Sequence, residues 1–305
     1  MGEVVGVGAL SHAIAFLPPG EWDAFREAAR GRMQKRYGFL PELRPEVETE
    51  DDTDNARRYE RIAEGRRELG RKILAADPSV LVIVGDDQNE LFLDVHPPIA
   101  VYTGESFSLG GDAAREITCD SELARSFVTG GVEHAIEVAP VATLAGGHLP
   151  HAHAGVLEEL VPTWTGDVVL VFVDAIHACA PTPARCLQIG RLLQECISRQ
   201  EGRRAVILGS GGLSHFPASF PWKGYKGQAR FGDIAESFDR KVVSLLEGGD
   251  HEGLQQLTGD QFLEHGSGED RAWLVAAGAS HGREWDVTYE PFAKAMMGMG
   301  VGAAF

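Results

Sequence analysis

A strand that ends in a glycine-rich turn and a histidine constrains the fold of this chain more than any other feature. Residues 206–215 read VILGSGGLSH, which is an apolar run followed by the turn and His215. The β-branched residues of the run predict a buried strand, and the glycines let the backbone leave the sheet through conformations that other residues avoid. Ligands bind at the carboxyl ends of the strands in open α/β sheets, so His215 is a candidate acid/base or metal ligand. A lone histidine that only caps a turn is the alternative.

Three more apolar runs predict buried strands that end in polar side chains. They are residues 4–10 before His12, residues 79–85 before the polar run at 86–90, and residues 167–174 before His177. Helical spacing or helix-start signals predict helices near residues 18–36, 55–76, 181–199, 233–247 and 272–278. Strands that alternate with helices favour right-handed crossovers. We therefore expect one α/β domain over residues 1–305, with a central mixed or mostly parallel sheet and helices on both faces.

Composition limits the kinds of partner. The 305 residues are 44% hydrophobic, enough for a full core, and the formal net charge of -17 argues against nucleic acid or an anionic membrane surface. A small molecule is the favoured ligand. The four cysteines have no CxxC spacing, which favours free thiols. The sequence has no basic segment before its first apolar run and no apolar run long enough for a membrane span, so we expect a cytoplasmic protein.

Two further segments have features of ligand binding. His148, His151 and His153 surround Pro150, but their spacing matches no standard zinc module, and we expect at most one of them to contact a ligand. The pattern between Gly104 and Gly147 predicts only a helix near residues 121–129. Residues 216–225 are rich in aromatic residues and proline, which suits a loop that covers an aromatic ligand.

Four polar groups, far apart in sequence, are predicted to meet at one edge of the sheet. They are His12, the 86–90 turn, His215 and Glu269, which precedes the apolar helix at 272–278. A carboxylate at a helix N-terminus is favoured by the helix dipole in any case. Two imidazoles, an oxygen donor and a carboxylate nevertheless suit a non-haem iron(II) site.

These residues resemble the class III extradiol ring-cleavage dioxygenases, the superfamily of the protocatechuate 4,5-dioxygenase catalytic subunit, and most of all the branch around the methylgallate dioxygenases. The matching runs extend in order over nearly the whole chain: SH at 11–12, GDDQNELF at 85–92, PTPARC at 181–186, IG at 189–190, SGGLSH at 210–215, GE at 268–269 and WLVAAGA at 273–279.

The resemblance implies a role for each matching residue. It implies that His12 and Glu269 bind Fe(2+), and that His215 takes a proton from a catechol-type substrate while O2 opens the ring. It also implies that His151 and His177 contact the substrate. The chain departs from the family at Gln88, which stands where the protocatechuate enzymes have their second metal histidine. We predict Gln88 as the third ligand, with Glu90 as the nearest substitute.

Two other functions stay open at this point. A zinc ion held by His12, Gln88 and Glu269 would suit a metal-dependent hydrolase or lyase on the same scaffold. A catalytically silent homologue that binds an aromatic ligand is the second alternative. The resemblance further implies self-association, and in some relatives a small partner subunit caps the site.

Overall fold

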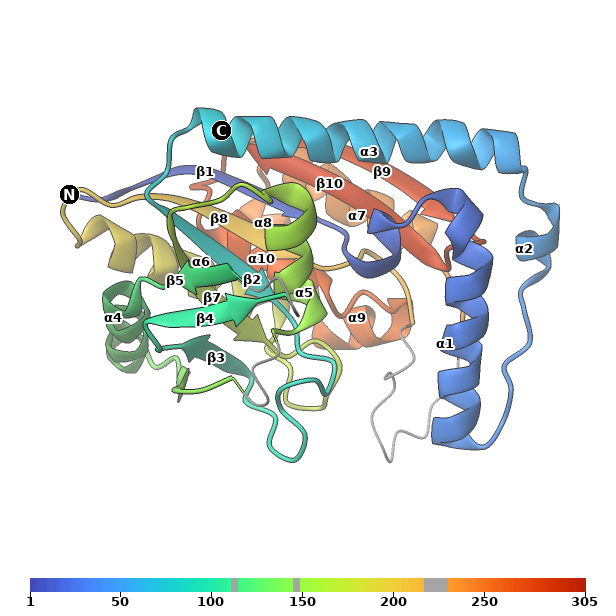
Figure 1. Cartoon of the computed structure of the whole chain (residues 1–305), viewed down its shortest axis with the longest axis horizontal. Coiled ribbons are helices and arrows are strands. Elements are labelled where there is room, and N and C mark those ends of the chain that lie inside the picture. The colour runs from blue at the N-terminus through green and yellow to red at the C-terminus, as the bar shows by residue number, and fades with distance from the viewer. Residues whose placement is uncertain (111–114, 145–148, 217–229) are drawn as a thin grey trace.

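An eight-stranded mixed sheet forms the centre of the fold, in the order β6-β3-β7-β2-β8-β1-β10-β9 (Figure 1). The computed structural model describes residues 1–110, 115–144, 149–216 and 230–305. The strands are β1 (Glu3–Leu10), β2 (Val80–Gly85), β3 (Ile99–Tyr102), β6 (Ala139–Val141), β7 (Asp167–Val173), β8 (Arg204–Ser210), β9 (Asp286–Phe292) and β10 (Met297–Ala304), and β4 (Ser106–Leu109) pairs with β5 (Arg115–Thr118) in a separate hairpin.

The inner strands are parallel and buried on both faces. β7, β2, β8 and β1 are parallel neighbours, whereas β3 and β10 are antiparallel to β7 and β1. Along β2, the valines at 80, 82 and 84 pack into one core cluster, and Leu81 and Ile83 pack into the other. A strand with apolar groups on both faces must be covered twice, so the continuous apolar runs predicted the central layer correctly.

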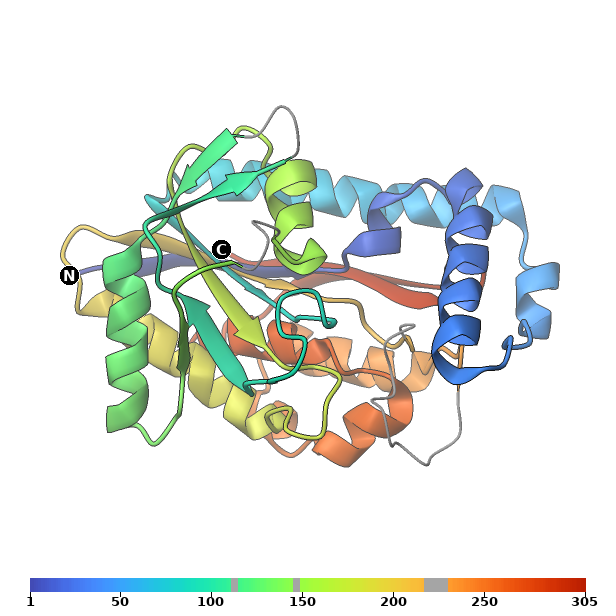
Figure 2. The same ribbon diagram turned by 60° about the horizontal axis from the view of Figure 1, so that its bottom comes forward.

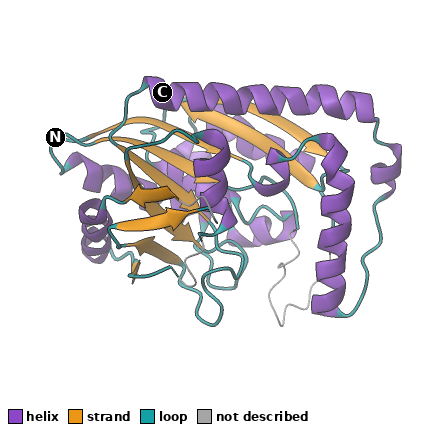
Figure 3. Ribbon diagram, viewed as in Figure 1, coloured by secondary structure: helices purple, strands orange, loops and turns teal. Residues whose placement is uncertain are grey.

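Helices cover both faces of this sheet (Figures 2 and 3). The helical segments are η1 (Ala13–Phe16), η2 (Pro19–Glu21), α1 (Trp22–Tyr37), α2 (Pro45–Thr49), α3 (Asp52–Ala75), α4 (Ser121–Glu133), α5 (His151–Gly155), the π-helical turn η4 (Val156–Leu160), α6 (Pro183–Ser198), α7 (Glu236–Glu247), α8 (His251–Gln255), α9 (Gly259–His265) and α10 (Asp270–Gly278). Helix α3 and η4 lie on one face, and α4, α6, α7 and α10 pack on the other. The α/β fold class is confirmed.

The strand register aligns the carboxyl ends of three neighbouring strands, β2, β8 and β1. β8 lies between β2 and β1, and Ser210 at its end pairs with Gly85 on one side and Leu10 on the other. The residues that follow these three positions therefore leave the sheet side by side at its carboxyl edge.

Two hairpins have no counterpart in the sequence prediction. β4 and β5 lie in the weakly patterned segment after Gly104, and β9 and β10 add two antiparallel strands at the C-terminal end. In the parts of the chain that the structure describes, no helix is both long enough and apolar enough to span a bilayer.

Candidate metal and ring-binding site

The end of β8 is packed tightly against the first turn of α10. A Cβ atom on Gly209 would lie 2.5 Å from the carbonyl oxygen of Ala272, and one on Gly211 would lie 2.7 Å from that of Glu269. The indole nitrogen of Trp273 donates a hydrogen bond to the Gly211 carbonyl at 2.8 Å. Glycine is needed here because the helix approaches the strand backbone closely, and this contact fixes the position of Glu269.

Glu269 is the central side chain of the site and is 2% exposed. One carboxylate oxygen accepts the backbone N–H of Gly212 at 2.6 Å and lies 3.4 Å from Nε2 of His12. The other accepts from the amide of Gln88 at 2.7 Å and lies 3.1 Å from Nε2 of His215. Segments that follow β1, β2 and β8 thus meet at one carboxylate.

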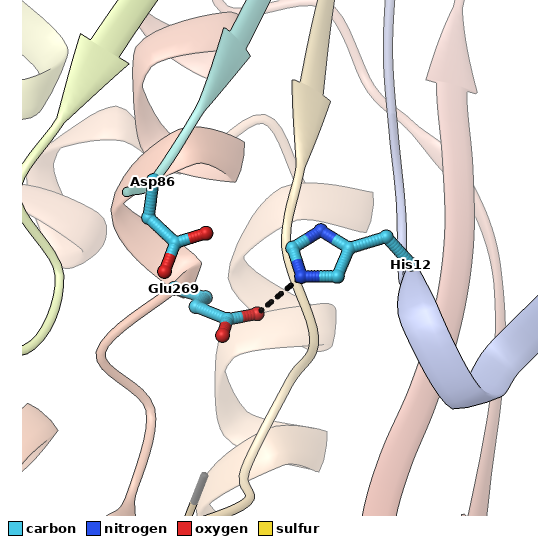
Figure 4. A group of neighbouring side chains, drawn as sticks. All are labelled: His12, Asp86 and Glu269. Carbon is cyan, nitrogen blue, oxygen red and sulfur yellow. Dashed lines mark ion pairs between the residues drawn. The ribbon is translucent and has the colours of Figure 1, made fainter. Parts of the chain in front are cut away.

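His12, Asp86 and Glu269 form a buried group suited to a cation (Figure 4). Each residue offers one ligand atom, and these atoms lie within 4.8 Å of one another. Among the described residues, neither carboxylate oxygen of Asp86 has a hydrogen-bond partner, although both are buried. A buried carboxylate without a donor is costly, so this orphaned group fits a bound cation.

The protonation equilibria agree with a metal-ligating set. Burial lowers the pKa of His12 to about 3, which leaves a neutral imidazole with a lone pair for a metal. Burial, followed by the charge of Glu269, raises the pKa of Asp86 well above its usual range. Burial also opposes ionisation of Glu269, but the two neighbouring histidines and the Gly212 N–H outweigh it and lower the pKa of this carboxyl. Two carboxyl groups beside each other are easiest to ionise together when a cation lies between them.

His215 is held with its Nε2 atom toward Glu269. Its Nδ1 lies 2.8 Å from the carbonyl of Leu213, and because a carbonyl only accepts, Nδ1 carries a hydrogen. Burial lowers the pKa of His215, but the charge and hydrogen bond of Glu269 raise it overall to about 9. The Nε2 atom is therefore the position at which this ring exchanges a proton.

A second imidazole lies beside His12. The ring of His151 meets that of His12 edge-on, with centroids 4.7 Å apart. Glu90 accepts the backbone N–H of His151 at 3.0 Å and also contacts its ring Nδ1. Burial lowers the pKa of His151, but its hydrogen bond and charge interaction with Glu90 raise it overall to about 9.

A cavity of about 770 Å³ opens above these groups. Its inner end is lined by His12, Gln88, Glu90, His151 and His215. Its walls are mainly apolar. An apolar cavity with a few convergent polar groups at one end is the usual form of a small-molecule site. The polar end of the cavity lies next to Glu269, which contacts His12, Gln88 and His215.

Comparison with known proteins assigns the family. Residues 44–303 match the family described as the catalytic LigB subunit of aromatic ring-opening dioxygenase. The chain belongs to this family.

Two named relatives and one solved structure resemble the chain at modest identity. A 2,3-dihydroxyphenylpropionate/2,3-dihydroxicinnamic acid 1,2-dioxygenase from Cupriavidus pinatubonensis is 27% identical over 257 residues, covering 68% of this chain and 78% of the relative. A protein of the same name from Rhodococcus is 25% identical over 245 residues, covering 66% and 76%. An uncharacterized protein from Escherichia coli K12 has the same fold, with a TM-score of 0.52, 16% identity, and coverage of 97% and 98% of the two chains. The superfamily prediction is confirmed, whereas none of these relatives singles out the methylgallate branch.

Most of the site residues predicted from the sequence lie together in the structure, and Asp86 joins them. His12, Gln88, His215 and Glu269 surround the same position, as does His151. Whether Gln88 ligates a metal stays a prediction, since its amide nitrogen contacts Glu269. Sequence reasoning placed Asp86 in the polar turn but did not name it as a ligand. The available signal was its place directly after a fully buried strand.

His177 and His153 lie elsewhere. His177 does not line the cavity, because its ring is held by Asp174 at 3.0 Å and Asn89 at 3.2 Å and stacks on His96. Its position therefore does not support the predicted contact with substrate. His153 is buried, and its Nε2 lies 2.9 Å from the carbonyl of Val171. His148 and residues 217–225 of the predicted covering loop lie outside the described residues.

Proposed function

We propose that this protein is a metal-dependent extradiol dioxygenase that opens the ring of a catechol-type substrate with O2. The observation that carries the proposal is the convergence of His12, Asp86 and Glu269 beneath a cavity that also presents His215. Membership in a family of aromatic ring-opening dioxygenases supports the reaction class. The names of the relatives, which describe enzymes for 2,3-dihydroxylated aromatic acids, support an aromatic diol as substrate.

The metal would be held by His12, Asp86 and Glu269, and the neighbouring Gln88 amide is a further candidate ligand. One imidazole nitrogen and carboxylate oxygens suit iron(II). Iron(II), if bound there, would favour the ionised form of the diol and would supply a route for electrons from the ring to O2. The protein's own part is to exclude water, orient the ring and move protons.

His215 is the proposed acid/base. Its Nδ1 donates to the Leu213 carbonyl, so proton exchange falls to its Nε2. Against the effect of burial, Glu269 raises the pKa of His215 to about 9 in the metal-free protein, and a cation bound to Glu269 would offset that charge. The Nε2 atom could then receive the proton of a diol hydroxyl and later return it to a product oxygen. The overall reaction breaks the carbon–carbon bond next to the diol and places both oxygen atoms of O2 in the product. His151, oriented by Glu90, lines the same end of the cavity and is proposed to contact the substrate.

Oxygen consumption tests this function directly. Protein purified without oxygen and loaded with iron(II) is mixed with catechols that carry different substituents, in an oxygen electrode. We expect one O2 to be consumed per diol lost, and no consumption with the matching 1,3-diols, which cannot bind through both oxygens. Turnover without O2 would indicate hydrolase or lyase chemistry, and binding of diols without turnover would indicate a silent homologue. Either result contradicts the proposal.

A further inference from the structure

Arg271 is a buried cation that the proposed reaction does not use. It lies in the first turn of α10, two residues after Glu269, and is 6% exposed. Its Nε atom donates a hydrogen bond to the carbonyl of Pro181 at 2.7 Å. Its Nη1 atom donates to the carbonyls of Gly268 at 3.0 Å and Ala175 at 3.4 Å. These carbonyls hold the guanidinium in place, but they carry no net negative charge.

No carboxylate pairs with this guanidinium in the parts of the chain that the structure describes. Arg26 is equally buried, and it pairs with Asp23 at 2.7 Å. Nη2 of Arg271, in contrast, has neither an ion-pair nor a hydrogen-bond partner among the described residues. Burial lowers the pKa of Arg271, which means that its surroundings disfavour the charged form. A buried charge is costly unless it is paired, so Arg271 lacks an anion.

A second cavity, of about 220 Å³, lies beside Arg271. It shares no lining residue with the larger cavity above Glu269. The unpartnered Nη2 atom lies next to the wall of this second cavity, because a Cβ atom on the lining residue Gly259 would be 3.9 Å from it. Most of the wall is apolar and comes from the segment after β7 and from α9, with Ile176, Phe262 and Leu263 as its largest apolar side chains.

Two other polar side chains line the second cavity. The ring of His177 already contacts Asp174 at 3.0 Å and Asn89 at 3.2 Å. Asp260, in the first turn of α9, is exposed, and the structure shows no ion pair between it and Arg271. The buried cation of this cavity therefore has no anion in its own wall.

We propose that the second cavity binds a small carboxylate with an apolar body. The carboxylate contacts Nη2 of Arg271 and supplies the negative charge that this guanidinium lacks. The apolar body packs against Ile176, Phe262 and Leu263. The cavity is smaller than the roughly 300–1,000 Å³ of sites for drug-sized molecules, so the ligand is compact. The inference depends neither on a metal nor on the dioxygenase reaction.

Calorimetric titration of the full chain, without added metal and in a buffer free of carboxylates, tests the inference. The probes are butanoate, its neutral amide butanamide, and inorganic phosphate. We expect butanoate to bind about 10- to 100-fold more tightly than butanamide, which is the range for a hydrogen bond to a charged group. Phosphate should bind more weakly than butanoate, because it has no apolar part for the walls.

Substitutions locate the carboxylate. Arg271→Gln should bind butanoate and butanamide equally. Ala178 lines the same cavity and is exposed, so Ala178→Glu adds a competing carboxylate at little cost to folding and should remove most of the preference for butanoate. Ala178→Gln is the control of matched size without the charge and should keep the preference. Arg32→Gln changes a cation of the larger cavity and should also keep it.

Four results would overturn the inference. They are equal binding of butanoate and butanamide by the unchanged protein, tighter binding of phosphate than of butanoate, full preference for butanoate in either Arg271→Gln or Ala178→Glu, and loss of the preference in Arg32→Gln, which would place the carboxylate in the larger cavity. The Ala178 pair keeps the test decisive even if Arg271→Gln folds poorly. Since no step needs turnover, the result is independent of whether the protein opens aromatic rings.

Discussion

Replacing Asp86 by asparagine tests the metal site most sharply, because the expected effect depends on whether metal is present. The substitution keeps the side-chain size but removes the negative charge. In the metal-free protein this carboxylate is buried beside Glu269, without a hydrogen-bond partner among the described residues. Burial and the charge of Glu269 make an ionised Asp86 unfavourable in the metal-free protein, and a neutral asparagine avoids this cost. We therefore expect the metal-free Asp86→Asn variant to be at least as stable as the unchanged protein.

The metal reverses this order. A ligand present at 100 times its dissociation constant stabilises the folded state by about 2.7 kcal/mol. With an unfolding entropy of about 2.1 cal/mol/K per residue, the whole chain would gain roughly 4 °C in melting temperature. We assume that loss of an anionic ligand weakens metal binding about 100-fold, which is the upper end of the effect of mutating residues that only support a ligand. At the same metal concentration the metal would then stabilise the variant by about 0.4 kcal/mol, which raises its melting temperature by less than ~1 °C.

The assay is thermal unfolding under anaerobic conditions with and without iron(II), together with elemental analysis of the protein after desalting. Asp94→Asn is the matched control, since it removes the same charge from an exposed residue of the same segment. Gln88→Met is measured in parallel to test Gln88 as a ligand. If Asp86→Asn keeps the full shift with iron(II) and Gln88→Met loses it, the assignment of Asp86 is refuted and the sequence prediction of Gln88 is correct.

Three other perturbations are expected to act differently. His215→Gln should keep its iron content but lower turnover by about 10²- to 10⁴-fold, the usual contribution of a positioned acid/base, and unchanged turnover in the oxygen electrode would remove His215 from the mechanism. His177→Ala should leave kcat/KM for the diol within about twofold, because the ring lies outside the cavity, so a selective rise in KM would restore its predicted contact with substrate. Burial raises the pKa of Asp239 to about 6, so the folded protein holds the carboxyl proton of Asp239 more tightly than the unfolded chain does. The contribution of Asp239 to the stability of the fold therefore falls as the pH rises from about 4 through 6. Tyr289→Phe removes a hydrogen bond of 2.6 Å to Asp239 and should cost about 1.5–3 kcal/mol at pH 7.5 but only about 0.5–1.5 kcal/mol at pH 5 in chemical denaturation, whereas a pH-independent loss would contradict this account.

The sequence predicted the strand ends well, because a strand buried on both faces is apolar throughout and the first polar residue marks where it leaves the sheet. This logic located His12, the turn after Gly85, and His215. It could not give the order of the strands, and the order decides which ends meet. β2, β8 and β1 are neighbours, so their ends share one position. β7 lies beyond β2, so the segment after it, with His177, turns toward Asp174 and Asn89.

The C-terminal hairpin was not predicted from the sequence because its second strand, β10, is rich in glycine. β10 reads MGMGVGAA, in which glycine rather than a polar residue alternates with the apolar side chains, and β-branched residues are few. The structure gives the physical reason. A Cβ atom on Gly300 would lie 2.9 Å from the ring of Trp273, and one on Gly298 would lie 3.0 Å from the ring of Tyr289. Glycine in this strand makes room for large aromatic rings from the neighbouring elements, a requirement that no local pattern records.

Asp86 was not predicted as a metal ligand, for a different reason. The resemblance directed attention to Gln88, where the family's second metal histidine would stand, whereas the structure places a carboxylate two residues earlier beside His12 and Glu269. A set of one imidazole and two carboxylates is harder and more negative than one with two imidazoles, so it should bind manganese(II) well relative to iron(II). Gln88→His adds a nitrogen donor at the family's position. We expect this substitution to raise the affinity for iron(II) more than that for manganese(II), measured by anaerobic competition between the two metals. An unchanged ratio would mean that residue 88 does not reach the metal, and that Asp86 has taken over the role of the missing histidine.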